Sequence, residues 1–276
     1  MSVEFSAKKR VATSEAHKPS DPAFATTAIL AWPSPPETIR LEMNQIHLWC
    51  AAMSDFEAKL EEFLVMLSPE ECTRAEKFRF SKDRSQYIIR HGILRVLLGR
   101  YLGLPASSVN FSRAVLGKPE IKADLVPDDL HFNDSHSGNL ALFVVTQDSP
   151  VGVDVEYLRP VPDFLEIASR FFSPRETEAL MALPMDRRLR GFFACWTRKE
   201  AILKATGQGI GEGLAKVEVA LPPWQELETR QTVGKSEDRR EWQLRSFSPA
   251  PGYLGALAFR NHNVRLSQWK VHAPSR

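Results

Sequence analysis

Two acidic side chains, two residues apart, interrupt the apolar segment Gly152-Val153-Asp154-Val155-Glu156. Side chains alternate between the two faces of a β-strand, so the valines would enter a core while Asp154 and Glu156 share the opposite face. Neighbouring carboxylates repel each other unless a cation lies between them. The segment therefore predicts either a solvent-facing strand or part of a Mg²⁺ site, because Mg²⁺ prefers oxygen ligands such as carboxylates.

A third carboxylate, Glu200, falls among large apolar side chains on one face of a predicted helix. Burying a carboxylate without a partner is costly, so this position requires an explanation. One interpretation is an internal ion pair from Glu200 to Lys204, four residues later. The other is a Mg²⁺ site in which Glu200 joins the two strand carboxylates, with Lys199 and Lys204 directed at phosphate groups.

Three other segments carry groups that could bind an anion. Ser135-His136-Ser137 offers hydroxyl, imidazole and backbone donors in a turn, although a hairpin turn held by its own hydrogen bonds is the alternative. Gly117-Lys118-Pro119 is a turn with a lysine at its tip. The run Lys77–Arg84 alternates basic and aromatic residues, which is more typical of a solvated face than of an RNA-binding strip.

The hydrophobic pattern predicts mixed strands and helices that would carry these groups. Strands are expected at Ile46–Trp49, Leu140–Thr146, Val151–Glu156, Trp242–Phe247 and Leu254–Phe259. Helices are expected at Asp55–Leu67 and Tyr87–Leu102, and two others are expected to begin at Pro69 and Pro174. A further helix is expected to run to about Thr206, with Asp186 as its N-cap. Ser68 and Ser173 provide helix-start signals, and Gly103 and Gly207 would end the two long helices.

Composition limits the class of protein. The 276 residues, 43% of them hydrophobic, suffice for one large domain or two small ones, and a net charge of +2 predicts no nucleic-acid partner. We expect no membrane segment, because no run approaches ~20 apolar residues and Met1–Ser20 lacks the apolar centre of a secretory signal. Cys50, Cys72 and Cys195 fit free thiols in a reducing compartment, which favours the cytoplasm.

The chain is expected to contain a leader and two subdomains. Residues 1–40 are rich in proline and predict a flexible leader. Residues 41–150 and 151–276 each mix helix and strand, although no repeat shows at the level of residues. The predicted fold class is therefore α+β, built from a pair of similar small units.

Four motifs, taken together and in order, resemble those of the Sfp-type 4′-phosphopantetheinyl transferases. They are Gly117-Lys118-Pro119, Ser135-His136-Ser137, Gly152-Val153-Asp154-Val155-Glu156 and Trp196-Thr197-Arg198-Lys199-Glu200-Ala201-Ile202-Leu203-Lys204. The resemblance covers about residues 46–260. It implies two similar α/β subdomains in a pseudo-dimer, with the active site in the cleft between them. It also implies a monomer that transfers the phosphopantetheine arm of coenzyme A to a serine of an acyl or peptidyl carrier protein, releasing 3′,5′-ADP.

The same resemblance implies a role for each candidate residue. Asp154, Glu156 and Glu200 would bind Mg²⁺, and Glu200, or a metal-bound water that it orients, would accept the serine proton. The residues implied to contact coenzyme A are Lys82, Arg113, Lys118, Ser135, His136, Lys199 and Lys204. Lys199 and Lys204 would hold the pyrophosphate. Ser135 and His136 would hold the 3′-phosphate. The chain departs from the family at Asp134, where relatives usually have an apolar residue, and a carboxylate there would weaken phosphate binding unless it turns away.

Two other functions fit parts of the same pattern. A different Mg²⁺-dependent phosphate-transfer or hydrolysis enzyme could use the same three carboxylates. A non-enzymatic module could bind a carrier protein or RNA through Lys77–Arg84, but it would have no need for all three carboxylates. The sequence does not set which carrier protein is modified.

Overall fold

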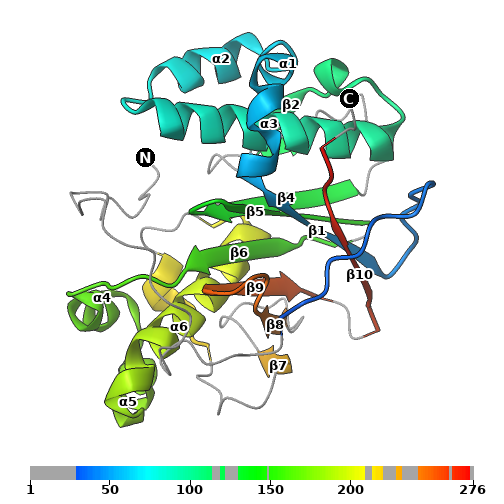
Figure 1. Ribbon diagram of the computed structural model, residues 1–276. Helices are drawn as coiled ribbons and strands as arrows, with labels where there is room; N and C mark the ends of the chain where they lie inside the picture. Colours follow the sequence, from blue (N-terminus) through cyan, green and yellow to red (C-terminus); the bar gives the residue numbers. More distant parts are fainter. Residues whose placement is uncertain are drawn as a thin grey trace. The chain divides into compact units, whose positions relative to one another are not determined.

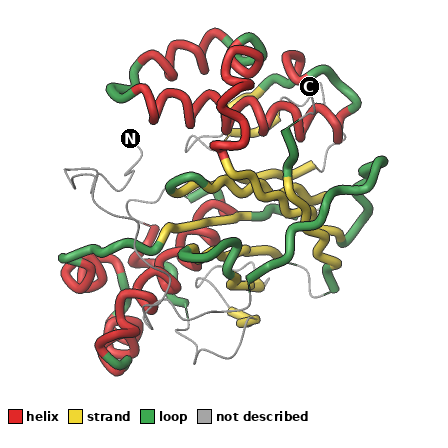
Figure 2. The backbone as a smooth tube through the Cα atoms, in the orientation of Figure 1, coloured by secondary structure: helices red, strands yellow, loops and turns green. Residues whose placement is uncertain are grey.

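The computed structural model describes residues 29–113, 119–121, 130–147, 149–208, 213–219, 228–231, 242–260 and 263–273 (Figure 1). The chain divides into two compact units. The first unit comprises Ala31–Val151 and Asn261–Arg276, and the second comprises Gly152–Arg260 together with Ile29 and Leu30. Both combine helices with strands, as Figure 2 shows, which agrees with the expected α+β class.

The first unit is built on a four-stranded sheet in the order β10-β1-β5-β4. Its strands are β1 (Gln45–Ala52), β4 (Leu130–Ser137), β5 (Leu140–Gln147) and β10 (Arg265–Lys270). Strands β4 and β5 form an antiparallel hairpin, and β1 pairs antiparallel with β5 but parallel with β10. A separate pair joins β2 (Phe111–Arg113) to β3 (Pro119–Ile121).

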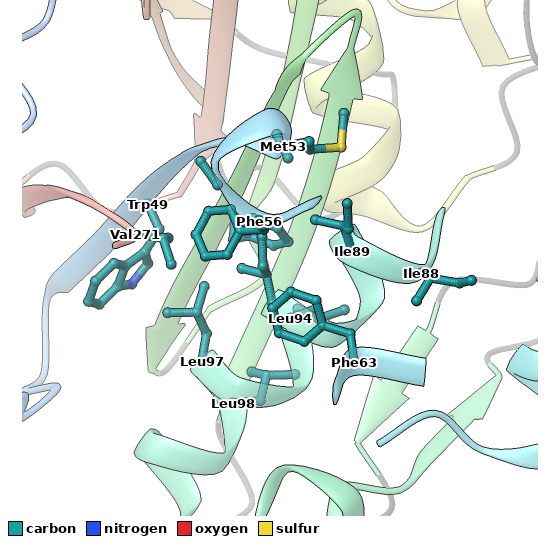
Figure 3. Close-up of a cluster of buried hydrophobic side chains, with 14 of the residues drawn as sticks. Trp49, Met53, Phe56, Phe63, Ile88, Ile89, Leu94, Leu97, Leu98 and Val271 are labelled. Carbon is teal, nitrogen blue, oxygen red and sulfur yellow. The ribbon is translucent and has the colours of Figure 1, made fainter. Parts of the chain in front are cut away.

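The helices of the first unit are a 3₁₀ helix (Met53–Lys59), α1 (Leu60–Leu64), α2 (Pro69–Glu76), α3 (Ser81–Leu102) and a short 3₁₀ turn (Ala106–Ser108). The predicted cap of α2 is confirmed, because the Ser68 hydroxyl accepts from the Glu71 amide while the Glu71 carboxylate accepts from the Ser68 amide. Helix α3 begins six residues before the predicted start, and it buries one side against the sheet in the core shown in Figure 3.

The second unit repeats this plan. Its sheet has the order β6-β9-β8-β7, with β6 (Gly152–Tyr157), β7 (Glu228–Gln231), β8 (Trp242–Phe247) and β9 (Tyr253–Phe259) all paired antiparallel. Its helices are α4 (Phe164–Phe171), α5 (Pro174–Ala182), α6 (Met185–Thr206) and a 3₁₀ turn (Leu214–Lys216). The predicted cap of α6 is wrong: Pro184 is the N-cap, and Asp186 lies in the first turn.

The likeness of the two units is visible in their elements although it is not visible residue by residue. Each has a helix opened by a Ser-Pro capping box, α2 and α5, followed by a 22-residue helix, α3 and α6. Each long helix ends at a glycine in the left-handed region, Gly103 at φ 65° and Gly207 at φ 71°, which few other residues adopt. This repetition matches the pair of similar subdomains that the resemblance implies.

The boundaries of the units differ from the predicted leader and subdomains. The Lys270 amide donates to the Pro33 carbonyl at 3.0 Å, and the Gln268 side chain donates to the Ala31 carbonyl at 2.8 Å. Ile39 packs against the core of the first unit. Residues 31–40 therefore belong to that unit, and so do residues 261–276, because β10 completes its sheet. Both segments pair with residues far away in the chain, so the sequence around each of them does not reveal the pairing.

Deleting residues 1–40 is expected to destabilise the first unit, whereas the matched deletion of residues 1–28 removes none of these contacts. The longer deletion loses the backbone acceptors of Ala31 and Pro33 and the apolar side chain of Ile39. We expect a loss of roughly 1–3 kcal/mol in unfolding free energy relative to the shorter deletion. Chemical denaturation of both proteins measures it, and equal midpoints would contradict the assignment.

Candidate active site

Strand β6 presents its two acidic residues on one face, as predicted. Asp154 lies opposite Ala256 and Glu156 opposite Leu254 in a regular antiparallel ladder with β9, so both side chains leave the same face. Helix α6 packs against β6 and β9. The approach is close at Gly152, where an added Cβ would lie 2.0 Å from the Ala201 carbonyl oxygen. This glycine brings the strand next to the helix segment that carries Glu200.

Glu200 is buried beside the two strand carboxylates. Burial, followed by the negative charge of Asp154, raises the pKa of Glu200 to about 8. The charge of Glu156 acts in the same direction, while Lys204 and a hydrogen bond from the Trp196 side chain act against it. A carboxyl group with this pKa carries its proton at pH 7 when no cation is bound. The second unit therefore brings together three acidic groups that were predicted to lie close together.

Lys204 forms an ion pair with a strand carboxylate. Its Nζ donates to Oδ1 of Asp154 at 2.7 Å, and the side chains are 20% and 5% exposed, respectively. The sequence suggested Glu200 as the partner of Lys204 within one helix, but the bond that forms crosses from α6 to β6. Lys204 consequently places a positive charge among the acidic groups.

An apolar hollow lies beside Glu156, one of the three acidic residues. It is lined by Glu156, Arg159, Val161, Phe192, Phe193 and Trp196, and has a volume of about 210 Å³ including solvent at its mouth. Arg159 donates to Glu156 at 3.3 Å. Glu156 therefore has a cationic neighbour, the exposed guanidinium of Arg159. The sequence analysis did not identify Arg159.

The residues present fit a Mg²⁺ ion by their chemistry, although they do not form a ready cage. Among the described residues, no three His, Cys, Asp or Glu side chains converge as a preformed metal cluster. Mg²⁺ needs few protein ligands, because water and substrate phosphates complete its octahedron. Burial, together with the charges of Asp154 and Glu156, raises the pKa of Glu200, so a third carboxylate is disfavoured there unless a cation binds beside it.

Lys199 does not share the surroundings of Lys204. Its side chain is 0% exposed, and Nζ donates to Oε2 of Glu176 at 2.6 Å and to the carbonyl of Val217. Oε1 of Glu176 accepts from the Val219 amide at 2.6 Å. Lys199 therefore ties α6 to α5 and to the segment after α6. Its position does not support the expected contact with a pyrophosphate.

Ser135 and His136 lie at the end of β4 in the first unit, before the turn at Gly138. They are consecutive in a regular ladder, opposite Leu142 and Ala141, so their side chains leave opposite faces of the strand. Ser135 is buried and His136 half-buried. The two side chains therefore do not form a single cluster, as a shared phosphate contact would require.

The remaining candidates can be located only in part. Lys82 is exposed in the first turn of α3. Arg113 ends β2, where its backbone alone is described, and Lys118 lies outside the described residues.

Comparison with known proteins decides the family. Residues 150–258 match the model of the 4′-phosphopantetheinyl transferase superfamily, and residues 49–148 match that of the 4′-phosphopantetheinyl transferase N-terminal domain. The chain is 37% identical over 238 residues to 4′-phosphopantetheinyl transferase HetI of Nostoc sp., covering 86% of this chain and 97% of that protein. The chain belongs to the 4′-phosphopantetheinyl transferase superfamily.

Two further relatives are less similar to this transferase. Sfp of Bacillus subtilis is 29% identical, over 71% of this chain and 84% of its own length. The human L-aminoadipate-semialdehyde dehydrogenase-phosphopantetheinyl transferase is 26% identical, over 70% of this chain and 67% of its own length.

The predicted family, fold and enzyme class are confirmed. The chain is a 4′-phosphopantetheinyl transferase, which uses coenzyme A to modify carrier proteins. In the described part of the chain, no helix is both long and apolar enough to cross a membrane.

Replacing Lys204 of this transferase with methionine should lower both activity and stability. Asp154 loses the ammonium that now balances it, so the metal-free protein should lose about 1–3 kcal/mol of unfolding free energy. Mg²⁺ should restore part of this stability. Transfer should fall about 30- to 1000-fold, which corresponds to about 2–4 kcal/mol in the transition state. Turnover and melting with and without Mg²⁺ measure both effects, with exposed Lys216→Met as the control. Normal turnover would remove Lys204 from the site.

Proposed function

We propose that this transferase is Mg²⁺-dependent and that Asp154, Glu156 and Glu200 hold the ion. The observation that carries the proposal is the raised pKa of Glu200 beside two further carboxylates, with Lys204 as the cation at hand. Such a group of acids is unfavourable in an empty site, and a divalent cation relieves it. When bound, Mg²⁺ would neutralise charge on the pyrophosphate of coenzyme A.

The chain's own residues would perform the remaining chemistry. Glu200 would lose its own proton when a cation binds nearby, and its carboxylate could then take the proton of the carrier serine. The serine oxygen forms a bond to the β-phosphorus of coenzyme A, and the bond from that phosphorus to the leaving oxygen breaks. The leaving group is 3′,5′-ADP, which departs with the electron pair. Lys204, one helical turn beyond Glu200, is positioned to exchange Asp154 for a phosphate oxygen.

The first unit would contribute contacts to the nucleotide end of coenzyme A. We propose that His136 and Lys82 face the 3′-phosphate, and that Ser135 contacts the coenzyme from the other face of β4. Arg113 and Lys118 stay candidates from the family resemblance. We also propose a cytoplasmic monomer, since two similar units occur within one chain and the cysteines Cys50, Cys72 and Cys195 are free thiols.

Mass spectrometry of apo-carrier proteins tests the proposal. The protein is incubated with coenzyme A and either an acyl or a peptidyl carrier, with Mg²⁺ or with excess EDTA. We expect a gain of about 340 Da, the mass of the arm added to serine, with Mg²⁺ and none with EDTA. Release of 3′,5′-ADP without a mass gain would instead indicate hydrolysis. An equal mass gain in EDTA would contradict the metal.

A further inference from the structure

A row of polar side chains on α3 faces the end of β4. Lys82, Gln86 and Arg90 recur every fourth residue, so they lie on one side of the helix. Nε2 of Gln86 donates to the Gly138 carbonyl at 2.9 Å, and the Arg90 guanidinium donates to the Asp134 carboxylate.

These two contacts flank His136 on β4. Asp134 precedes this histidine by two residues and Gly138 follows it by two, so Asp134 and His136 share the face that α3 covers. Along a strand, this spacing is about 7 Å. An acidic side chain therefore lies on the same face as the histidine proposed to meet a phosphate.

We infer that Arg90 is a positioning residue for the phosphate-binding end of β4, which cancels the charge of Asp134 beside His136. The inference rests on the proposed transfer from coenzyme A. The side chains of Arg90 and Asp134 are 18% and 11% exposed, so water screens their charges poorly. Without the guanidinium, the carboxylate would oppose an approaching phosphate. With it, the pair is neutral and the strand keeps its position.

Arg90 is held from its other side by a buried network. Burial lowers the pKa of His91, so this imidazole is neutral and accepts from Arg90 at 3.3 Å through Nε2. Its Nδ1 then donates to Glu71 at 3.0 Å. Arg95 donates twice to the other oxygen of Glu71, at 2.9 and 2.7 Å. Two arginines and two carboxylates thus balance one another, and Arg90 is fixed between α2 and β4.

Comparison of two donors tests the inference, because 3′-dephospho-coenzyme A lacks the phosphate in question. Arg90→Leu should raise KM for coenzyme A at least about 10-fold, while KM for 3′-dephospho-coenzyme A changes less than about 3-fold. Adding Asp134→Asn to Arg90→Leu should return KM for coenzyme A to within about 3-fold of the native value. Asp134→Asn alone should lower KM for coenzyme A, because Arg90 then adds a net positive charge.

The controls separate this inference from folding and from the proposed function. Arg100→Leu replaces an exposed arginine of the same helix and should change neither KM. If Arg90→Leu fails to fold, the lowered KM for coenzyme A expected of Asp134→Asn still tests the inference. Equal loss with both donors, or no recovery in the double variant, would overturn the inference. Native protein that transfers from neither donor would instead overturn the proposed function.

Discussion

Glu200→Gln is expected to abolish transfer while stabilising the metal-free protein. Glutamine removes the proton acceptor and one metal ligand, so turnover should fall at least about 1000-fold. It also removes an acid that sits unfavourably beside Asp154 and Glu156. A relief of about 1–2 kcal/mol would raise the melting temperature by about 2–8 °C in a protein of this size.

The stabilisation should depend on pH in a definite direction. The pKa of Glu200 is about 8 in the folded protein and 4.5 in a free chain, so between these values the folded state binds the extra proton. Stability contributed by the native Glu200 therefore decreases as pH rises from about 4.5 to 8, and Glu200→Gln should gain its full advantage above pH 8. Melting from pH 5 to 9 without Mg²⁺ measures this, with exposed Glu178→Gln as control. A variant that melts at or below the native temperature at pH 9 would contradict the acidic cluster.

Lys199→Met should destabilise the protein more than Lys204→Met or Lys216→Met does. Its ammonium is fully buried and pairs with Glu176, which is 2% exposed. Removing one partner leaves a buried charge alone, at a cost of about 3–5 kcal/mol. The same carboxylate also accepts hydrogen bonds from the Ser173 and Val219 amides. An unpaired charge on Glu176 would therefore also destabilise the start of α5 and the segment after α6.

Urea denaturation of Lys199→Met measures this loss, and Lys216→Met provides an exposed lysine as control. Adding Glu176→Gln to Lys199→Met should recover part of the stability, because the amide oxygen still accepts hydrogen bonds without a charge. If the variant instead unfolds at the same urea concentration as the native protein but no longer uses coenzyme A, the result would indicate that Lys199 binds the pyrophosphate.

Local patterns predicted the starts of α2 and α5 and the acidic strand. The capping boxes at Ser68 and Ser173 depend on residues three apart, so the sequence carries their full signal. Asp154 and Glu156 were placed on one face by alternation alone. The family and the reaction followed from the order of four motifs, and the matched family models confirm them.

Partners far apart in the chain were not predicted. A lysine next to Glu200 could point to a phosphate or into the protein, and the choice depends on Glu176, 23 residues away. The counter-charge of Asp134 is Arg90, 44 residues earlier, so the departure from the family pattern looked unfavourable in the sequence alone. Alternation along β4 also separates Ser135 from His136, because the strand continues through a motif that reads as a turn.

The parallel pairing of β1 with β10 has a consequence for synthesis of the chain. Residues 45–50 pair with residues 265–270, so the sheet of the first unit lacks an edge strand until residue 270 has been made. Until then, β1 exposes unpaired backbone groups to other nascent chains. Residues 152–260, by contrast, hold all four strands of their sheet within one continuous stretch. The later-translated half can thus complete its hydrogen bonding before the earlier one, reversing the usual order of folding on the ribosome.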